Sequence, residues 1–131
     1  MRDFGRQRVV FLDRDGTINE DVDYLSDPSG LVLIEGAGKA IRLLNERGIK
    51  VVVVTNQSGV GRGYFTGADV EAVNAKLIEL LAMDGASIDA VYYCAHTPDD
   101  GCECRKPGKA LAELAAKEHA FDLRGAYVVG D

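Results

Sequence analysis

The sequence predicts an α/β fold in which a Rossmann-like parallel sheet carries helices on both faces. Short apolar runs rich in β-branched residues alternate along the chain with longer segments of helical periodicity. Each apolar run stops at polar residues, as strands buried inside a parallel sheet do. The 131 residues are 47% hydrophobic and 27% charged, a composition that can form one buried core. We therefore expect a single domain over residues 1–131.

Four segments have the composition of buried strands. They lie at residues 8–12, 51–54, 88–93 and 126–129. The first ends at Asp13, and the second is a run of valines that ends at Thr55. Ligands of open parallel sheets bind at the edge where the strands end. The polar residues that follow each strand are therefore the candidates for function.

Three segments show the apolar spacing of helices. The first covers residues 36–47 and is followed by Gly48, a common helix stop. The second follows Thr66 and Asp69, whose spacing resembles a capping box, and the third covers residues 109–119. The apolar stripe of the second helix consists of Val70, Val73, Leu77, Leu80 and Leu81. This stripe is expected to pack into the core.

The charge balance limits the possible partners. With a formal net charge of −6, the surface as a whole repels nucleic acid and anionic membranes. Charged residues interrupt the N-terminal segment where a secretory signal would be apolar, and no segment reaches transmembrane length. We expect a cytoplasmic monomer that binds neither nucleic acid nor membrane. Any anionic substrate must then be held by local cations or a metal ion.

Two carboxylates follow the first predicted strand. Asp13 and Asp15 lie within one turn of each other, and Gly16 permits a close approach of the backbone to a ligand. Two such acids repel, so bringing them together requires a cation or a shared proton. Mg²⁺ meets this need and leaves one carboxylate as a nucleophile and the other as an acid and base. A solvated acidic turn is the structural alternative.

Polar residues also follow the other predicted strands. The second strand leads into hydroxyl and amide side chains with exposed backbone N–H groups, which suit phosphate oxygens. These residues are Thr55, Asn56, Gln57 and Ser58. Taken alone, they fit an ordinary turn or helix cap better than a phosphate site. Arg105 and Lys106 follow the third strand after a loop, and Asp131 follows the fourth.

The order of these residues along the chain resembles the four motifs of the haloacid dehalogenase superfamily. The resemblance implies a phosphatase in which Asp13 attacks phosphorus and forms an aspartyl phosphate. Asp15 would protonate the leaving oxygen and later deprotonate the hydrolytic water, while Thr55 and Lys106 would hold the phosphoryl oxygens. Mg²⁺ would be bound by the Asp13 carboxylate, the Asp15 main-chain carbonyl and Asp131.

The space between the first two strands is filled by a loop and a helix, which leaves no room for a large cap domain. We therefore expect an open site that accepts a small phosphorylated metabolite. Loop residues would contact this substrate. In addition to Asn56, Gln57 and Ser58, the candidates are Asp21, Val22, Asp23, Tyr24, Arg62 and Arg105.

A second signal is the cysteine cluster. All three cysteines lie between positions 94 and 104 with a histidine among them, and together Cys94, His96, Cys102 and Cys104 match the ligand set of a closed structural Zn²⁺ site. Free buried cysteines or a Cys102–Cys104 disulfide are the alternatives. A zinc-binding loop placed just before Arg105 and Lys106 would aim both cations at the substrate.

The cysteine cluster also resembles two related phosphatase groups, which act on D-glycero-D-manno-heptose 1,7-bisphosphate at position 7 and on histidinol phosphate. The run from Thr55 to Gly63, with Arg62, is similar to the heptose group. The short loop between His96 and Cys102 is closer to the histidinol group. We expect the heptose bisphosphate to be the substrate, with histidinol phosphate as the alternative.

Two readings from other classes stay open. A phosphoacceptor receiver domain also places an acid cluster, Thr and Lys on a parallel sheet, but its phosphorylated aspartate follows the third strand, where this chain has the cysteine cluster. The second alternative is a non-catalytic zinc module that binds phosphorylated ligands. Continuous phosphate release separates an enzyme from both.

The fourth motif of the superfamily continues with a further acid beyond the position of Asp131. A fourth strand beside the first also needs cover on both faces. We therefore expect the phosphatase core to be truncated at its C-terminus, as a fragment of a longer protein with at least one more helix and strand.

Overall fold

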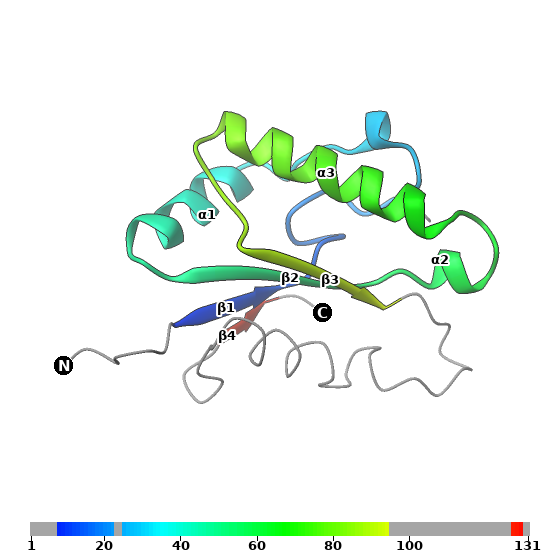
Figure 1. Ribbon diagram of the computed structural model, residues 1–131. Helices are drawn as coiled ribbons and strands as arrows, with labels where there is room; N and C mark the ends of the chain where they lie inside the picture. The colour runs from blue at the N-terminus through cyan, green and yellow to red at the C-terminus, as the bar shows by residue number, and fades with distance from the viewer. Residues whose placement is uncertain (1–7, 23–24, 95–126, 130–131) are drawn as a thin grey trace.

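A computed structural model describes residues 8–22, 25–94 and 127–129 (Figure 1). They form a four-stranded parallel sheet in the order β3-β2-β1-β4. The strands are β1 (Val9–Leu12), β2 (Lys50–Asn56), β3 (Ala90–Cys94) and β4 (Tyr127–Val129). All four predicted strands are confirmed, and β4 lies next to β1 as expected. The third begins two positions later than predicted, at Ala90, because its register is set by pairing with β2 from Val52 to Asn56.

The helices in the described ranges are also close to the prediction. They are η1 (Pro28–Gly30), α1 (Ala37–Glu46), α2 (Ser58–Gly61) and α3 (Gly67–Met83). The short α2 was not predicted, since four residues are too few for a periodic pattern. The capping box is confirmed: Thr66 Oγ1 accepts from the Asp69 N–H at 3.1 Å, and Asp69 Oδ2 accepts from the Thr66 N–H at 2.9 Å. The helix predicted at 109–119 lies outside the described residues.

Helices α1 and α3 pack on the same face of the sheet (Figure 1). Val10, Leu12, Val51 and Val53 form a buried cluster with the apolar residues of α3 on that face. Val9, Phe11 and Val52, which alternate with them toward the opposite face, are also at most 3% exposed. The two central strands are therefore buried on both faces, as their continuous apolar composition predicts.

The strand order places a topological switch point at β1. The chain goes from β1 to β2 and β3 on one side and returns to β4 on the other side. At the carboxyl edge, the Asp13 N–H donates to the Val129 carbonyl at 3.0 Å and the Gln57 N–H donates to the Cys94 carbonyl at 2.7 Å. These bonds, with the parallel pairing, bring the carboxyl ends of all four strands to one edge. None of the helices in the described ranges is long and apolar enough to cross a membrane.

Candidate active site

The loop after β1 is a tight turn that begins at Asp13. The Arg14 carbonyl accepts from the backbone N–H groups of Ile18 at 2.9 Å and Thr17 at 3.2 Å, and the Gly16 N–H donates to the Asn19 carbonyl at 2.8 Å. Gly16 has φ of +85°, a conformation that residues with a Cβ rarely adopt. The glycine therefore allows the chain to fold back directly beneath the strand end.

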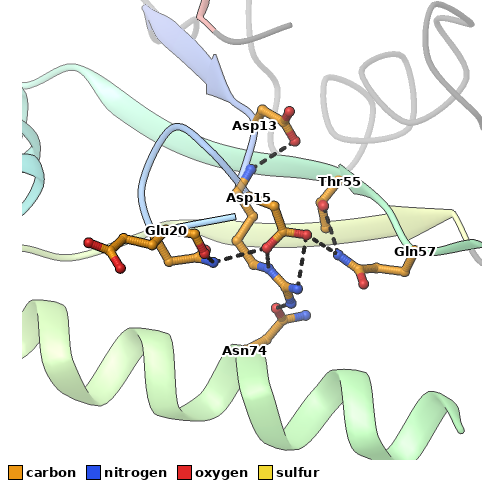
Figure 2. Close-up of polar contacts among 8 residues, drawn as sticks. Asp13, Asp15, Glu20, Thr55, Gln57 and Asn74 are labelled. Atoms are coloured by element: carbon orange, nitrogen blue, oxygen red, sulfur yellow. Dashed lines mark hydrogen bonds and ion pairs between the residues drawn. The ribbon is translucent and has the colours of Figure 1, made fainter. Parts of the chain in front are cut away.

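The carboxylate of Asp15 lies inside this turn and accepts hydrogen bonds on both oxygens (Figure 2). Oδ1 accepts from Arg14 Nε and Asn19 Nδ2, each at 3.0 Å. Oδ2 accepts from Gln57 Nε2 at 3.2 Å and Arg14 Nη2 at 3.3 Å. A carboxylate offers about four acceptor positions, and the side chains of three residues occupy them. These contacts fix the orientation of the group.

The guanidinium of Arg14 is fully buried, with 0% exposure. Besides its fork onto Asp15, its Nη1 donates to Asn74 Oδ1 at 2.9 Å. Asn74 belongs to α3 and reaches the loop from the helix below it (Figure 2). A buried charge needs an ion-pair partner and hydrogen bonds, and Asp15 and Asn74 supply both.

Thr55 and Gln57 connect this cluster to the end of β2. Thr55 is 1% exposed, and its Oγ1 accepts from Gln57 Nε2 at 3.0 Å. The same amide nitrogen donates to Asp15, so both of its hydrogens are used. A hydroxyl that accepts from one side can donate on another. The hydroxyl of Thr55 can therefore accept from Gln57 and donate to a further group at the same time.

Asp13 sits at the junction of β1 and the loop, partly exposed, and its Oδ1 accepts from the Arg14 backbone N–H at 2.9 Å. Carboxylate and main-chain carbonyl oxygens at such an edge are the hard donors that Mg²⁺ prefers, so Asp13 and Asp15 fit the predicted ion. Asp131 lies outside the described residues. Among residues 8–22, 25–94 and 127–129, no group of three or more His, Cys, Asp or Glu forms a metal cluster.

The structure thus brings together Asp13, Asp15, Thr55 and Gln57. Gln57 was predicted to contact substrate, but it is only 4% exposed and its amide nitrogen is bonded to other site residues.

The structure also describes other residues predicted for the site. Asp21, Val22 and Arg62 are exposed. Cys94 ends β3 at 1% exposure and takes part in a disulfide bond. Asn56 and Ser58 lie at the end of β2 and the start of α2.

Several predicted site residues lie outside the described ranges, so their positions stay predictions. They are Asp23, Tyr24, His96, Cys102, Cys104, Arg105, Lys106 and Asp131.

Sequence reasoning missed the supporting residues Arg14, Asn19 and Asn74. Asn74 interrupts the apolar stripe of α3 yet is only 8% exposed, and this break in the pattern was a usable signal. Asn19 is fully buried, and its Oδ1 has no hydrogen-bond partner within the described structure. Nothing in the local sequence distinguishes it from a solvated loop residue.

Comparison with known proteins agrees with this geometry. The family model for polynucleotide kinase 3 phosphatases matches residues 10–131. A D-glycero-beta-D-manno-heptose-1,7-bisphosphate 7-phosphatase of Pseudomonas aeruginosa is 42% identical over 94% of this chain and 70% of its own length. The chain belongs to this family of haloacid dehalogenase-like phosphatases. A probable heptose-bisphosphatase of Thermoplasma volcanium is 39% identical over 95% of this chain and 85% of its own.

A solved family structure extends the comparison to the fold. The D,D-heptose 1,7-bisphosphate phosphatase of Bordetella bronchiseptica, complexed with magnesium and phosphate, is 39% identical and superposes with a TM-score of 0.87. The matched region covers 95% of this chain and 70% of that one. The predicted superfamily, its α/β fold and its phosphatase class are therefore confirmed.

Proposed function

We propose that this chain removes the 7-phosphate of D-glycero-D-manno-heptose 1,7-bisphosphate through an aspartyl phosphate on Asp13. The observation that carries the proposal is the hydrogen-bonded cluster of Asp15, Gln57 and Thr55 next to Asp13 at the strand edge. The substrate is suggested by the names of the relatives, among them the Pseudomonas aeruginosa enzyme. The chemistry rests on this chain's own residues.

In the first half of the reaction, a carboxylate oxygen of Asp13 attacks phosphorus and the bond to the sugar oxygen breaks. Asp15 donates a proton to that oxygen as it leaves. Thr55 donates a hydrogen bond from its hydroxyl to a phosphoryl oxygen, since Gln57 already occupies one acceptor position of Oγ1. In the second half, Asp15 removes a proton from water, which attacks the phosphoryl group and frees Asp13.

The residues proposed for Mg²⁺ are the Asp13 carboxylate, the Asp15 main-chain carbonyl and Asp131. When bound, the ion would neutralise charge on the transferring phosphoryl group. Lys106 is proposed to add a cation at the same group, which the net charge of −6 makes necessary. Arg62 and Arg105 are proposed for the second phosphate of the substrate, with Asp21, Val22, Asp23, Tyr24, Asn56 and Ser58 lining the remainder.

A structural Zn²⁺ held by Cys94, His96, Cys102 and Cys104 is part of the proposal. A hydrogen bond links Cys94 to the candidate site, because the Cys94 carbonyl accepts from the N–H of Gln57 at 2.7 Å. This bond supports a role for the zinc loop in ordering the site. A metal that fixes Cys94 would therefore fix the residue that bridges Asp15 and Thr55. The disulfide at Cys94 is the competing state, because one sulfur cannot serve both.

The test is a phosphate-release screen with Mg²⁺ over heptose 1,7-bisphosphate, sugar monophosphates and histidinol phosphate. The expected result is continuous turnover with the highest kcat/KM for the heptose bisphosphate. A preference for histidinol phosphate would overturn the substrate and leave the mechanism in place. A single stoichiometric phosphorylation without turnover would favour a receiver domain, and binding without any reaction would favour a non-catalytic zinc module.

A further inference from the structure

We infer that Arg14 is a positioning residue for the acid–base group Asp15, and that Asn74 of α3 holds Arg14 in place. The inference rests on the proposed function, since it assigns Asp15 the proton transfer. It concerns a contact between the catalytic loop and a core helix that are 60 residues apart in the sequence.

The geometry of Arg14 supports positioning rather than substrate binding. Its Nε and Nη2 face the two oxygens of Asp15 at 3.0 and 3.3 Å, so the planar guanidinium meets the planar carboxylate as a fork. Its remaining terminal nitrogen, Nη1, is bonded to Asn74. Arg14 is 0% exposed, and each of its three side-chain nitrogens bonds Asp15 or Asn74, so the guanidinium is placed to hold protein groups rather than a ligand at the edge.

The position of Asn74 supports the second half of the inference. It is a polar residue on the buried face of α3, next to Val70, Val73 and Leu77. An amide in such a place is costly unless its hydrogen-bonding groups find partners. The side chain of Arg14 provides that partner, so the rigid helix fixes the guanidinium and the guanidinium fixes Asp15.

This arrangement has a chemical consequence that depends on the leaving group. A sugar alkoxide leaves only with a proton from the acid, whereas p-nitrophenolate is a weak base and leaves without one. Misplacing Asp15 should therefore slow the cleavage of a sugar phosphate far more than that of p-nitrophenyl phosphate. A lost phosphate-binding cation, or a partly unfolded protein, would slow both equally.

The experiment measures kcat/KM for heptose 1,7-bisphosphate and for p-nitrophenyl phosphate with the full chain and Mg²⁺. The variants are Arg14→Lys, which keeps the charge but loses the fork, and Asn74→Ala. We expect the sugar phosphate value to fall by about 10- to 100-fold, a part of what general acid catalysis contributes, and the aryl phosphate value to fall by less than about 3-fold.

The matched control is Asn45→Ala. Asn45 is also an asparagine on a helix, and within the described residues its side chain bonds the backbone of Ser87, at 3.1 and 2.9 Å. Both kcat/KM values should stay within about 2-fold of wild type for the fraction that remains folded.

Equal losses on both substrates in Arg14→Lys or Asn74→Ala, with wild-type turnover intact, would overturn this inference alone. If Arg14→Lys does not fold, Asn74→Ala still decides it, because the substitution leaves the charge pair of Arg14 and Asp15 present. A wild-type chain that releases phosphate from neither ester rejects the proposed function and this inference with it.

Discussion

Gln57 Nε2 donates a hydrogen bond to Asp15 Oδ2 at 3.2 Å, although 42 residues separate the two in the sequence. The loop after β1 and the end of β2 are thereby joined through one side-chain amide. The same nitrogen donates to Thr55 Oγ1 at 3.0 Å. The proposed acid–base group and the proposed phosphate donor therefore share an anchor, and changing it should disturb both.

Replacing Gln57 tests this shared anchor. Gln57→Glu places a second carboxylate against Asp15, and like charges at this distance repel. We expect kcat to fall by about 100-fold in Gln57→Glu but only about 10-fold in Gln57→Met, which has a similar volume and no charge. In a pH series, the Gln57→Glu variant should recover activity as the pH falls, because protonating the introduced carboxyl removes the repulsion. Equal activity of both variants would show that charge at this position is irrelevant.

Asp13 and Asp15 are expected to behave differently when each is replaced by asparagine. Asp13→Asn should abolish turnover, because an amide cannot form the acyl phosphate. Asp15→Asn should slow both proton transfers and allow a phosphorylated chain to accumulate when an aryl phosphate is supplied. Mass spectrometry of rapidly quenched protein measures the added phosphoryl group. Wild-type activity in Asp13→Asn would refute the proposed nucleophile.

Metal analysis tests the proposed zinc site. We expect about one Zn²⁺ per chain, and we expect Cys102→Ser and Cys104→Ser to lower both Tm and kcat, because structural zinc contributes to folding. Removal by a chelator should have the same effect, and added Zn²⁺ should reverse it. Protein purified without chelator that holds no zinc and shows the Cys94 disulfide by mass spectrometry would contradict the proposal.

The start of α3 provides a stability prediction that is independent of catalysis. Thr66→Ala removes the hydroxyl that caps the Asp69 N–H, and we expect the free energy of unfolding to fall by about 1 kcal/mol. Thr66→Ser keeps the hydroxyl and serves as the control, with a change of less than about 0.5 kcal/mol. Urea denaturation of both variants measures the difference. A loss of the same size in Thr66→Ser would point to the methyl group rather than to the cap.

The sequence by itself determined the fold class and which polar residues follow β1 and β2. The runs of valine and other apolar residues indicate buried strands because a parallel sheet covered on both faces buries every side chain of such a run. Asp13 and Thr55 were found because each directly follows such a run, and parallel strands end at one edge. These signals are local, so no three-dimensional information was needed. The first residue of β3 was not determined by the sequence, since pairing with β2 sets where β3 begins.

The tertiary structure alone decided how the site is held together. From the sequence, Arg14 would be taken for an exposed charged residue in an acidic loop. Asn74 would be taken for an irregularity in the apolar pattern of a helix. Their bond depends on the distance between a turn and a helix that pack against the same sheet face. Gln57, which the sequence predicts as a substrate contact, is also a buried bridge between Asp15 and Thr55. Hydrogen bonds between distant segments are set by packing, so the break that Asn74 makes in the apolar stripe of α3 indicates a buried polar residue but not its partner.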